Sequence, residues 1–126
     1  MQTPYAVMLK WVNPFEDDSV IWTAWKNGKH SHSAGYGFRL SIEDRNQHFD
    51  QKWKTITIDL PHSDGFISVI VNVDGQAFWN GCCELRSVEI RQWLYRQRYA
   101  PWPDRMPPRF EVERLKDQHF KLIARV

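Results

Sequence analysis

QAFWNGCCELRSVEIRQWLYRQRY, residues 76–99, brings together more structural signals than any other stretch of the chain. It follows Asp74-Gly75, a dipeptide typical of tight hairpin turns, so we expect Gln76 to Trp79 to be a strand that pairs back on the preceding one. Asn80-Gly81 then interrupts the strand, and two adjacent cysteines follow. On an extended backbone neighbouring side chains point to opposite faces, so one cysteine should enter the core.

The second half of this stretch predicts a basic amphipathic helix that ends at about Arg98. Ser87 is a favoured N-cap residue, and a glutamate follows it in the first turn. Three apolar residues recur at helical spacing and should face the core: Ile90, Trp93 and Leu94. The outer face carries arginines, but we expect the helix to plug the fold and its arginines to be solvated.

The sequence predicts further elements on both sides of this stretch. Ser41 should cap a short helix, and the proline-rich residues 101–108 predict an extended strap with Trp102 packed on the core. Apolar alternation or β-branched and aromatic residues predict strands at Tyr5–Val12, Val20–Trp25, Gly35–Leu40, Trp53–Leu60 and Phe66–Val73, and a closing hairpin at Phe110–Leu115 and Phe120–Ala124. Pro61 and Asp64-Gly65 should end the fourth of these strands.

These elements predict a mainly β (α+β) fold, a small open β-barrel of about seven to eight strands with two short helices. The 126 residues are sufficient for one hydrophobic core, so we expect a single domain over residues 1–126. Seven tryptophans and an aromatic content of 14% should anchor that core, because large rings bury much apolar area.

The basic charge lies in the second part of the chain. The net charge is +2, but residues 1–83 carry −2 and residues 84–126 carry +4, mostly from arginine. Arginine suits forked contacts with phosphates and base edges. The chain has only two cysteines and neither a secretory signal nor a membrane-length apolar run, so we expect a cytoplasmic protein without disulfides and without membrane insertion.

The order of elements resembles that of the B3-like DNA-binding pseudobarrel, from about Ile21 to Leu122. The resemblance rests on a polar loop before an early strand (KNGKHSHSAGYGFRL), a short helix ending in RNQHF, the FWN turn, the helix VEIRQWL and the final hairpin. Plant transcription-factor domains and the effector domains of some restriction endonucleases share this fold. The resemblance implies a double-stranded DNA-binding module, and a recognition domain of a bacterial restriction or defence system is one form of it.

In that family two arms grip the major groove, and the resemblance places them at residues 26–39 and 76–86. The lysines suit phosphates, and asparagine suits an adenine edge. The first arm contributes Lys26, Asn27, Lys29, His30, His32 and Arg39, and the second contributes Gln76, Asn80 and Arg86. Alternatively, the first arm is an ordinary solvated hairpin loop, and in the second Asn80-Gly81 is simply a turn or bulge with Trp79 in the core.

Two other functions fit the sequence. His30 and His32 could serve a small metal-independent nuclease, because acid–base catalysis needs only two placed groups. The aromatic strap could instead serve a protein–protein adaptor of phage or plasmid origin. We predict no catalytic residue, metal ligand or cofactor, because no phosphate loop, nucleophile elbow or zinc motif is present.

Overall fold

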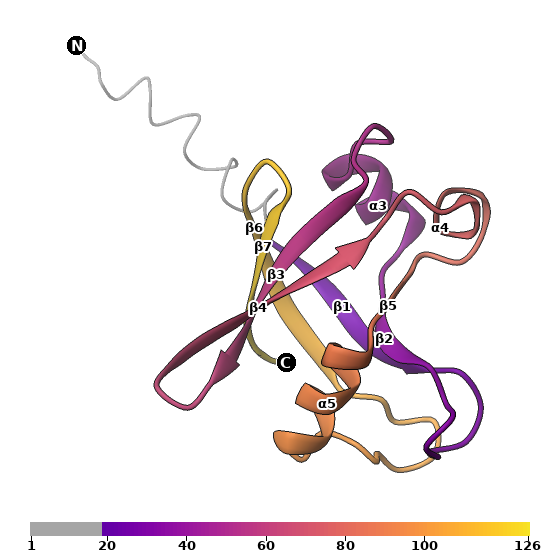
Figure 1. Cartoon of the computed structure of the whole chain (residues 1–126), viewed down its shortest axis with the longest axis vertical. Coiled ribbons are helices and arrows are strands. Elements are labelled where there is room, and N and C mark those ends of the chain that lie inside the picture. Colours follow the sequence, from indigo (N-terminus) through magenta and orange to yellow (C-terminus); the bar gives the residue numbers. More distant parts are fainter. Residues whose placement is uncertain (1–18) are drawn as a thin grey trace.

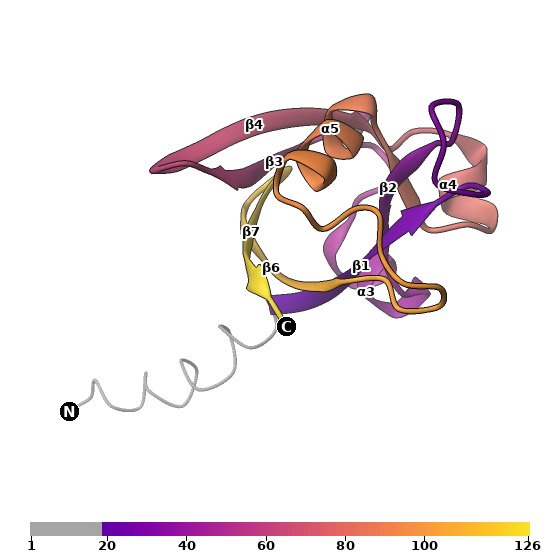
Figure 2. The same cartoon turned by 90° about the horizontal axis from the view of Figure 1, so that it is seen from below.

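In residues 19–126 seven strands form one curled open sheet, a half-barrel, in the order β4-β3-β7-β6-β1-β2-β5 (Figures 1 and 2). Neighbouring strands are antiparallel except β3 and β7, which are parallel. The structure is a computed structural model that describes residues 19–126, so the predicted strand at residues 5–12 lies outside it. The strands are β1 Ser19–Lys26, β2 Tyr36–Arg39, β3 Thr55–His62, β4 Gly65–Asn72, β5 Glu84–Arg86, β6 Arg109–Lys116 and β7 His119–Arg125.

In the same described part of the chain three helices accompany the sheet, one more than the sequence predicted. They are α3 Ile42–His48, α4 Gln76–Asn80 and α5 Val88–Arg96. The Ser41 and Ser87 hydroxyls accept backbone N–H bonds at the starts of α3 and α5, which confirms both predicted caps. Within the described residues no helix is long and apolar enough to cross a membrane.

The core lies on the concave side of the sheet. Trp22 has no exposed surface, and its ring centroid lies 5.7 Å from that of Phe38 and 5.4 Å from that of Phe120. The predicted apolar face of α5 covers this core, and the Trp93 indole N–H donates to the Pro61 carbonyl over 2.7 Å. Inward side chains thus alternate with outward ones along the strands, and the mainly β prediction is confirmed.

The predicted strand Gln76 to Trp79 is wrong, because these residues form α4. Gly75 precedes the helix in its N-cap position, and the tight hairpin turn lies earlier, at Ser63-Asp64 between β3 and β4. Tertiary contacts override the local turn signal here. Phe78 is buried in the core, and the Trp79 indole N–H donates to the Val73 carbonyl over 2.9 Å.

A buried arginine fixes α4 to α3. Arg45 is 7% exposed, and its Nη1 donates to the carbonyls of Phe78 and Trp79 over 2.8 and 2.9 Å. These carbonyls belong to the last turn of α4, where the helix dipole is negative and carbonyls lack helical partners. The guanidinium also lies 4.9 Å from the centroid of the Trp79 ring. These contacts offset the cost of burying the charge and stabilise the short helix that the sequence did not predict.

Two smaller predictions also change. Pro61 does not end β3 but lies inside it, opposite Phe66. The β7 partner stops two residues earlier, at Asp59, so the missing proline N–H leaves no gap in the ladder. A strand that the sequence did not indicate, β5, pairs with β2 and ends the sheet.

Gly37 offers a test of the β2–β5 contact. A Cβ atom at this position would lie 1.7 Å from the Leu85 carbonyl oxygen, so Gly37→Ala must push β5 away from β2. We expect a loss of at least about 3 kcal/mol in the free energy of unfolding, measured by urea denaturation.

Gly65→Ala is the matched control, since a Cβ there meets no atom within 4 Å. It should change the free energy of unfolding by less than about 1 kcal/mol. Equal effects of the two substitutions would contradict the close approach of β2 and β5.

Candidate nucleic-acid interface

The two predicted arms lie at opposite ends of one strip of surface. The β1–β2 connection, residues 27–35, is at one end, and α4 is at the other, with the paired strands β2 and β5 between them (Figure 1). The sheet register explains this placement, because Arg39 pairs with Glu84 near α4 whereas Gly37 pairs with Arg86 near the loop. We call this surface the basic strip.

Arg86 occupies the middle of the basic strip. It is exposed, and its guanidinium carbon lies 5.1 Å from the centroid of the Trp25 ring on β1. Gly35 leaves room for this arrangement, because a Cβ there would lie 3.1 Å from Arg86 Nε. The guanidinium is thus held on an aromatic face and still open to solvent, which lowers the entropy cost of a forked contact. The sequence did not indicate the role of Trp25.

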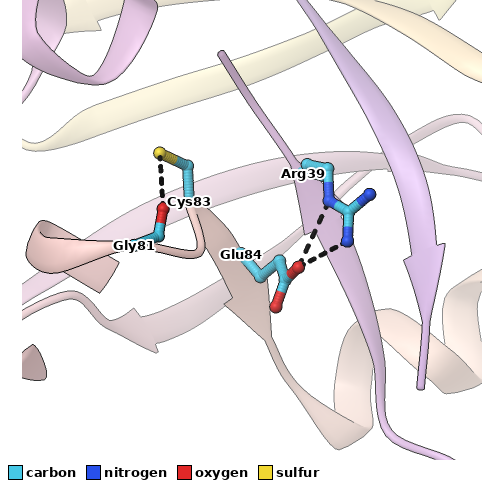
Figure 3. A network of polar contacts seen from close by, with 4 residues as sticks. All are labelled: Arg39, Gly81, Cys83 and Glu84. Carbon is cyan, nitrogen blue, oxygen red and sulfur yellow. Dashed lines mark hydrogen bonds and ion pairs between the residues drawn. The ribbon is translucent and has the colours of Figure 1, made fainter. Parts of the chain in front are cut away.

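Arg39 is less available than the sequence suggested. Its Nε and Nη2 both donate to one Glu84 carboxylate oxygen, over 3.2 and 2.6 Å (Figure 3). This ion pair offsets the charge of Arg39, although 58% of the arginine side chain is exposed. The neighbouring Cys83 is buried, with its Sγ 3.8 Å from the Gly81 carbonyl oxygen, and Cys82 is exposed. The prediction that one cysteine enters the core is confirmed.

His30 links the first arm to the rest of the fold through hydrogen bonds. Its Nε2 accepts the Trp102 backbone N–H over 3.3 Å, so this nitrogen carries no proton. We therefore assign the ring proton to Nδ1, which donates to the Tyr36 hydroxyl over 2.5 Å. The ring also meets Trp102 edge-on, with centroids 4.7 Å apart. Because both nitrogens are engaged, the structure gives His30 a positioning role in place of a contact with a ligand.

Tyr36 extends this hydrogen-bonded chain to α5. Its hydroxyl lies 2.8 Å from that of Tyr95. Burial is the largest cause that raises the pKa of Tyr36, and the hydrogen bond with Tyr95 is the second. The phenol therefore stays protonated and can donate to Tyr95. Arg91 closes the cluster, because its guanidinium lies 5.4 and 5.1 Å from the two tyrosine rings and donates to the Ser31 carbonyl over 3.2 Å. Arg91 is thus packed, whereas the sequence suggested a solvated side chain.

The other residues of the first arm face solvent. Asn27, Lys29 and His32 are exposed, and Lys26 is half-buried with its ammonium bonded to the Gly28 carbonyl. The Asn27 backbone N–H donates to Gly35 over 2.8 Å and closes the base of the loop.

In the second arm Gln76 and Asn80 are exposed at the two ends of α4. The structure therefore keeps three uncharged amide side chains, those of Asn27, Gln76 and Asn80, at the two ends of the basic strip.

The loop and strands of the strip, taken together with Lys26 and the adjoining helix α5, carry more positive charge than the whole chain. Residues 26–39 and 84–98, which contribute β2, β5, the loop and α5, contain seven lysines and arginines and two glutamates. Their net charge of +5 compares with +2 for the complete sequence. In residues 19–126 no group of three or more histidine, cysteine or acidic side chains has the arrangement of a metal site.

Comparisons with models of protein families, with curated proteins and with solved structures gave no match to this chain.

His30 predicts a stability that depends on pH. Burial, and secondly the positive charge of Lys26, lower the pKa of His30 below its usual 6.5. At pH values between the lowered pKa and 6.5, the unfolded chain then binds more protons than the folded chain. The contribution to stability is therefore complete above pH 6.5 and is lost as the pH falls through the lowered pKa.

Urea denaturation of the protein and of His30→Gln at about pH 7.5 and about pH 5 measures this difference. The glutamine cannot titrate, so we expect the variant to lose less stability on acidification than the protein with His30. His32→Gln is the control for removing a histidine from the same loop, because His32 is exposed, and it should keep the stability of the unaltered protein at about pH 7.5. Identical pH dependence in His30→Gln and the unaltered protein would contradict the assignment of a neutral imidazole to His30 in the folded chain.

Proposed function

We propose that this chain is a double-stranded DNA-binding module that contacts DNA with the basic strip. The observation that carries the proposal is the concentration of a +5 charge on the loop and strands of the basic strip and the adjoining α5 (residues 26–39 and 84–98), in a chain of net charge +2. Phosphate contacts dominate affinity for DNA, and a concentrated basic surface favours them. A place in a bacterial restriction or defence system is the setting that the resemblance to the B3-like pseudobarrel implies.

The geometry supports a division of roles within the strip. Lys29 and Arg86 are exposed cations suited to phosphates, and the Arg86 fork also suits a guanine edge. The amides of Asn27, Gln76 and Asn80 suit base edges in a groove. Because Arg39 is paired with Glu84 and His30 is engaged on both nitrogens, we assign these two to positioning.

The nuclease alternative is less favoured, because only one histidine of its pair is free. His30 uses Nδ1 for Tyr36 and Nε2 for Trp102, so only His32 is open for proton transfer. The adaptor alternative required the aromatic strap as its surface. Trp102 on that strap is half-buried and packs against His30 and Tyr36, so little of the ring is open to a partner.

Titration of a fluorescent randomised duplex pool, followed by anisotropy over a series of salt concentrations, tests the proposal. Affinity should fall steeply with salt, because each phosphate contact releases a counterion. Arg86→Ala should weaken binding about tenfold, and Lys29→Ala should weaken it and reduce the salt slope by about one.

Arg125→Ala is the matched control, since Arg125 also lies over a ring, that of Tyr99 at 5.7 Å, but belongs to β7. It should leave affinity nearly unchanged. Absent or salt-independent binding, or an equal loss in Arg125→Ala, would contradict the assignment of the basic strip.

A further inference from the structure

The outer edge of β4 presents unpaired backbone groups. Within residues 19–126, β4 pairs with β3 alone and ends the sheet. Just beyond the end of β4, the Val73 N–H donates to the Lys54 carbonyl over 2.9 Å. Backbone groups alternate in direction along a strand, so the odd-numbered residues of β4 direct theirs towards β3. The N–H and C=O groups of Phe66, Ser68 and Ile70 consequently point away from the sheet.

This edge lacks the features that usually prevent association. Residues 65–72, GFISVIVN, contain no charged residue and no proline. Two large apolar side chains are open to solvent, with 49% of Phe66 and 65% of Ile70 exposed. The nearest cation, Lys121, reaches Phe66 from β7, with its Nζ 4.6 Å from the ring centroid, and leaves the backbone edge uncovered.

The edge is also sterically accessible. β3 loses its β7 partner after Asp59, so the rest of the β3–β4 hairpin continues as two strands. Figures 1 and 2 both show this hairpin extending away from the rest of the molecule. A strand from another molecule can therefore approach the protruding end of β4.

We propose that β4 pairs with β4 of a second copy of this chain, antiparallel about a two-fold axis at Ser68. In this register Phe66 lies opposite Ile70 of the second copy, and Ile70 lies opposite its Phe66. Phe66, Ser68 and Ile70 direct their backbone groups outward, so each residue and its opposite number in the second copy can exchange both backbone hydrogen bonds. One register thus satisfies the free backbone groups and covers both exposed apolar side chains, which is why an identical strand fits this edge.

The charged side chains near the contact and the area that it would bury also agree with a second copy as the partner. Beyond the paired residues, the turn residue Asp64 comes opposite Asn72 of the second copy, whose amide can donate to the carboxylate. The two Asp59 carboxylates would be about 14 Å apart, which is three strand spacings and more than a Debye length. A contact of this kind buries less than about 1,200 Å², so we expect a reversible dimer that dissociates at micromolar concentrations.

Sedimentation velocity of the full chain over a range of concentrations tests the proposal. The 15.1 kDa chain should convert reversibly to a species of twice that mass as the concentration rises. Ile70→Lys places a charge opposite Phe66 of the second copy and should remain monomeric. Ser68→Pro should do the same by removing an outward N–H that β3 does not use, and circular dichroism should confirm that both variants are folded.

Val88→Lys is the matched control, because Val88 is 69% exposed but lies on α5, and it should dimerise as the unaltered chain does. A chain that stays monomeric to about 1 mM, or a dimer that persists in both β4 variants, would overturn the proposal. Growth beyond a dimer would also overturn it, since a two-fold pairing of edges is closed. The inference does not depend on DNA binding.

Discussion

The hydrogen-bonded chain from the Trp102 backbone through His30 and Tyr36 to Tyr95 is the constraint on which the loop end of the basic strip depends. It ties together the strap, the β1–β2 loop, the sheet and α5. The loop is polar and small, and Ala34 at its end is its one side chain packed against the hydrophobic core, so it would otherwise sample many conformations. Because Tyr36 is 1% exposed and belongs to β2, the core fixes the position of these polar contacts.

Arginines on aromatic faces recur in this molecule and act in two ways. Arg45 over Trp79 and Arg91 over the tyrosines use their donors on backbone carbonyls, so they hold segments of the chain together. Arg86 over Trp25 has the same stacking but remains exposed. Basic composition alone therefore does not identify a ligand contact, because only the burial and partners of each guanidinium separate the structural arginines from the available ones.

The sequence predicted features that depend on local patterns and missed those that depend on distant partners. The caps at Ser41 and Ser87, the apolar face of α5 and the closing hairpin follow from periodicity and capping chemistry, and the structure contains them. The α4 helix was missed because Arg45, more than thirty residues earlier, stabilises its last turn. His30 was taken for a surface residue because its partners lie six and 72 residues away in the chain.

The capping of α4 by Arg45 has a consequence for the behaviour of the strip in acid. A guanidinium keeps its proton at every pH at which proteins fold, and backbone carbonyls do not titrate, so acidification leaves this cap on α4 in place. The opposite end depends on a neutral imidazole and should loosen as His30 gains a proton. Mild acid should therefore release the two ends of the surface unequally, with the loop freed first while the helix stays docked.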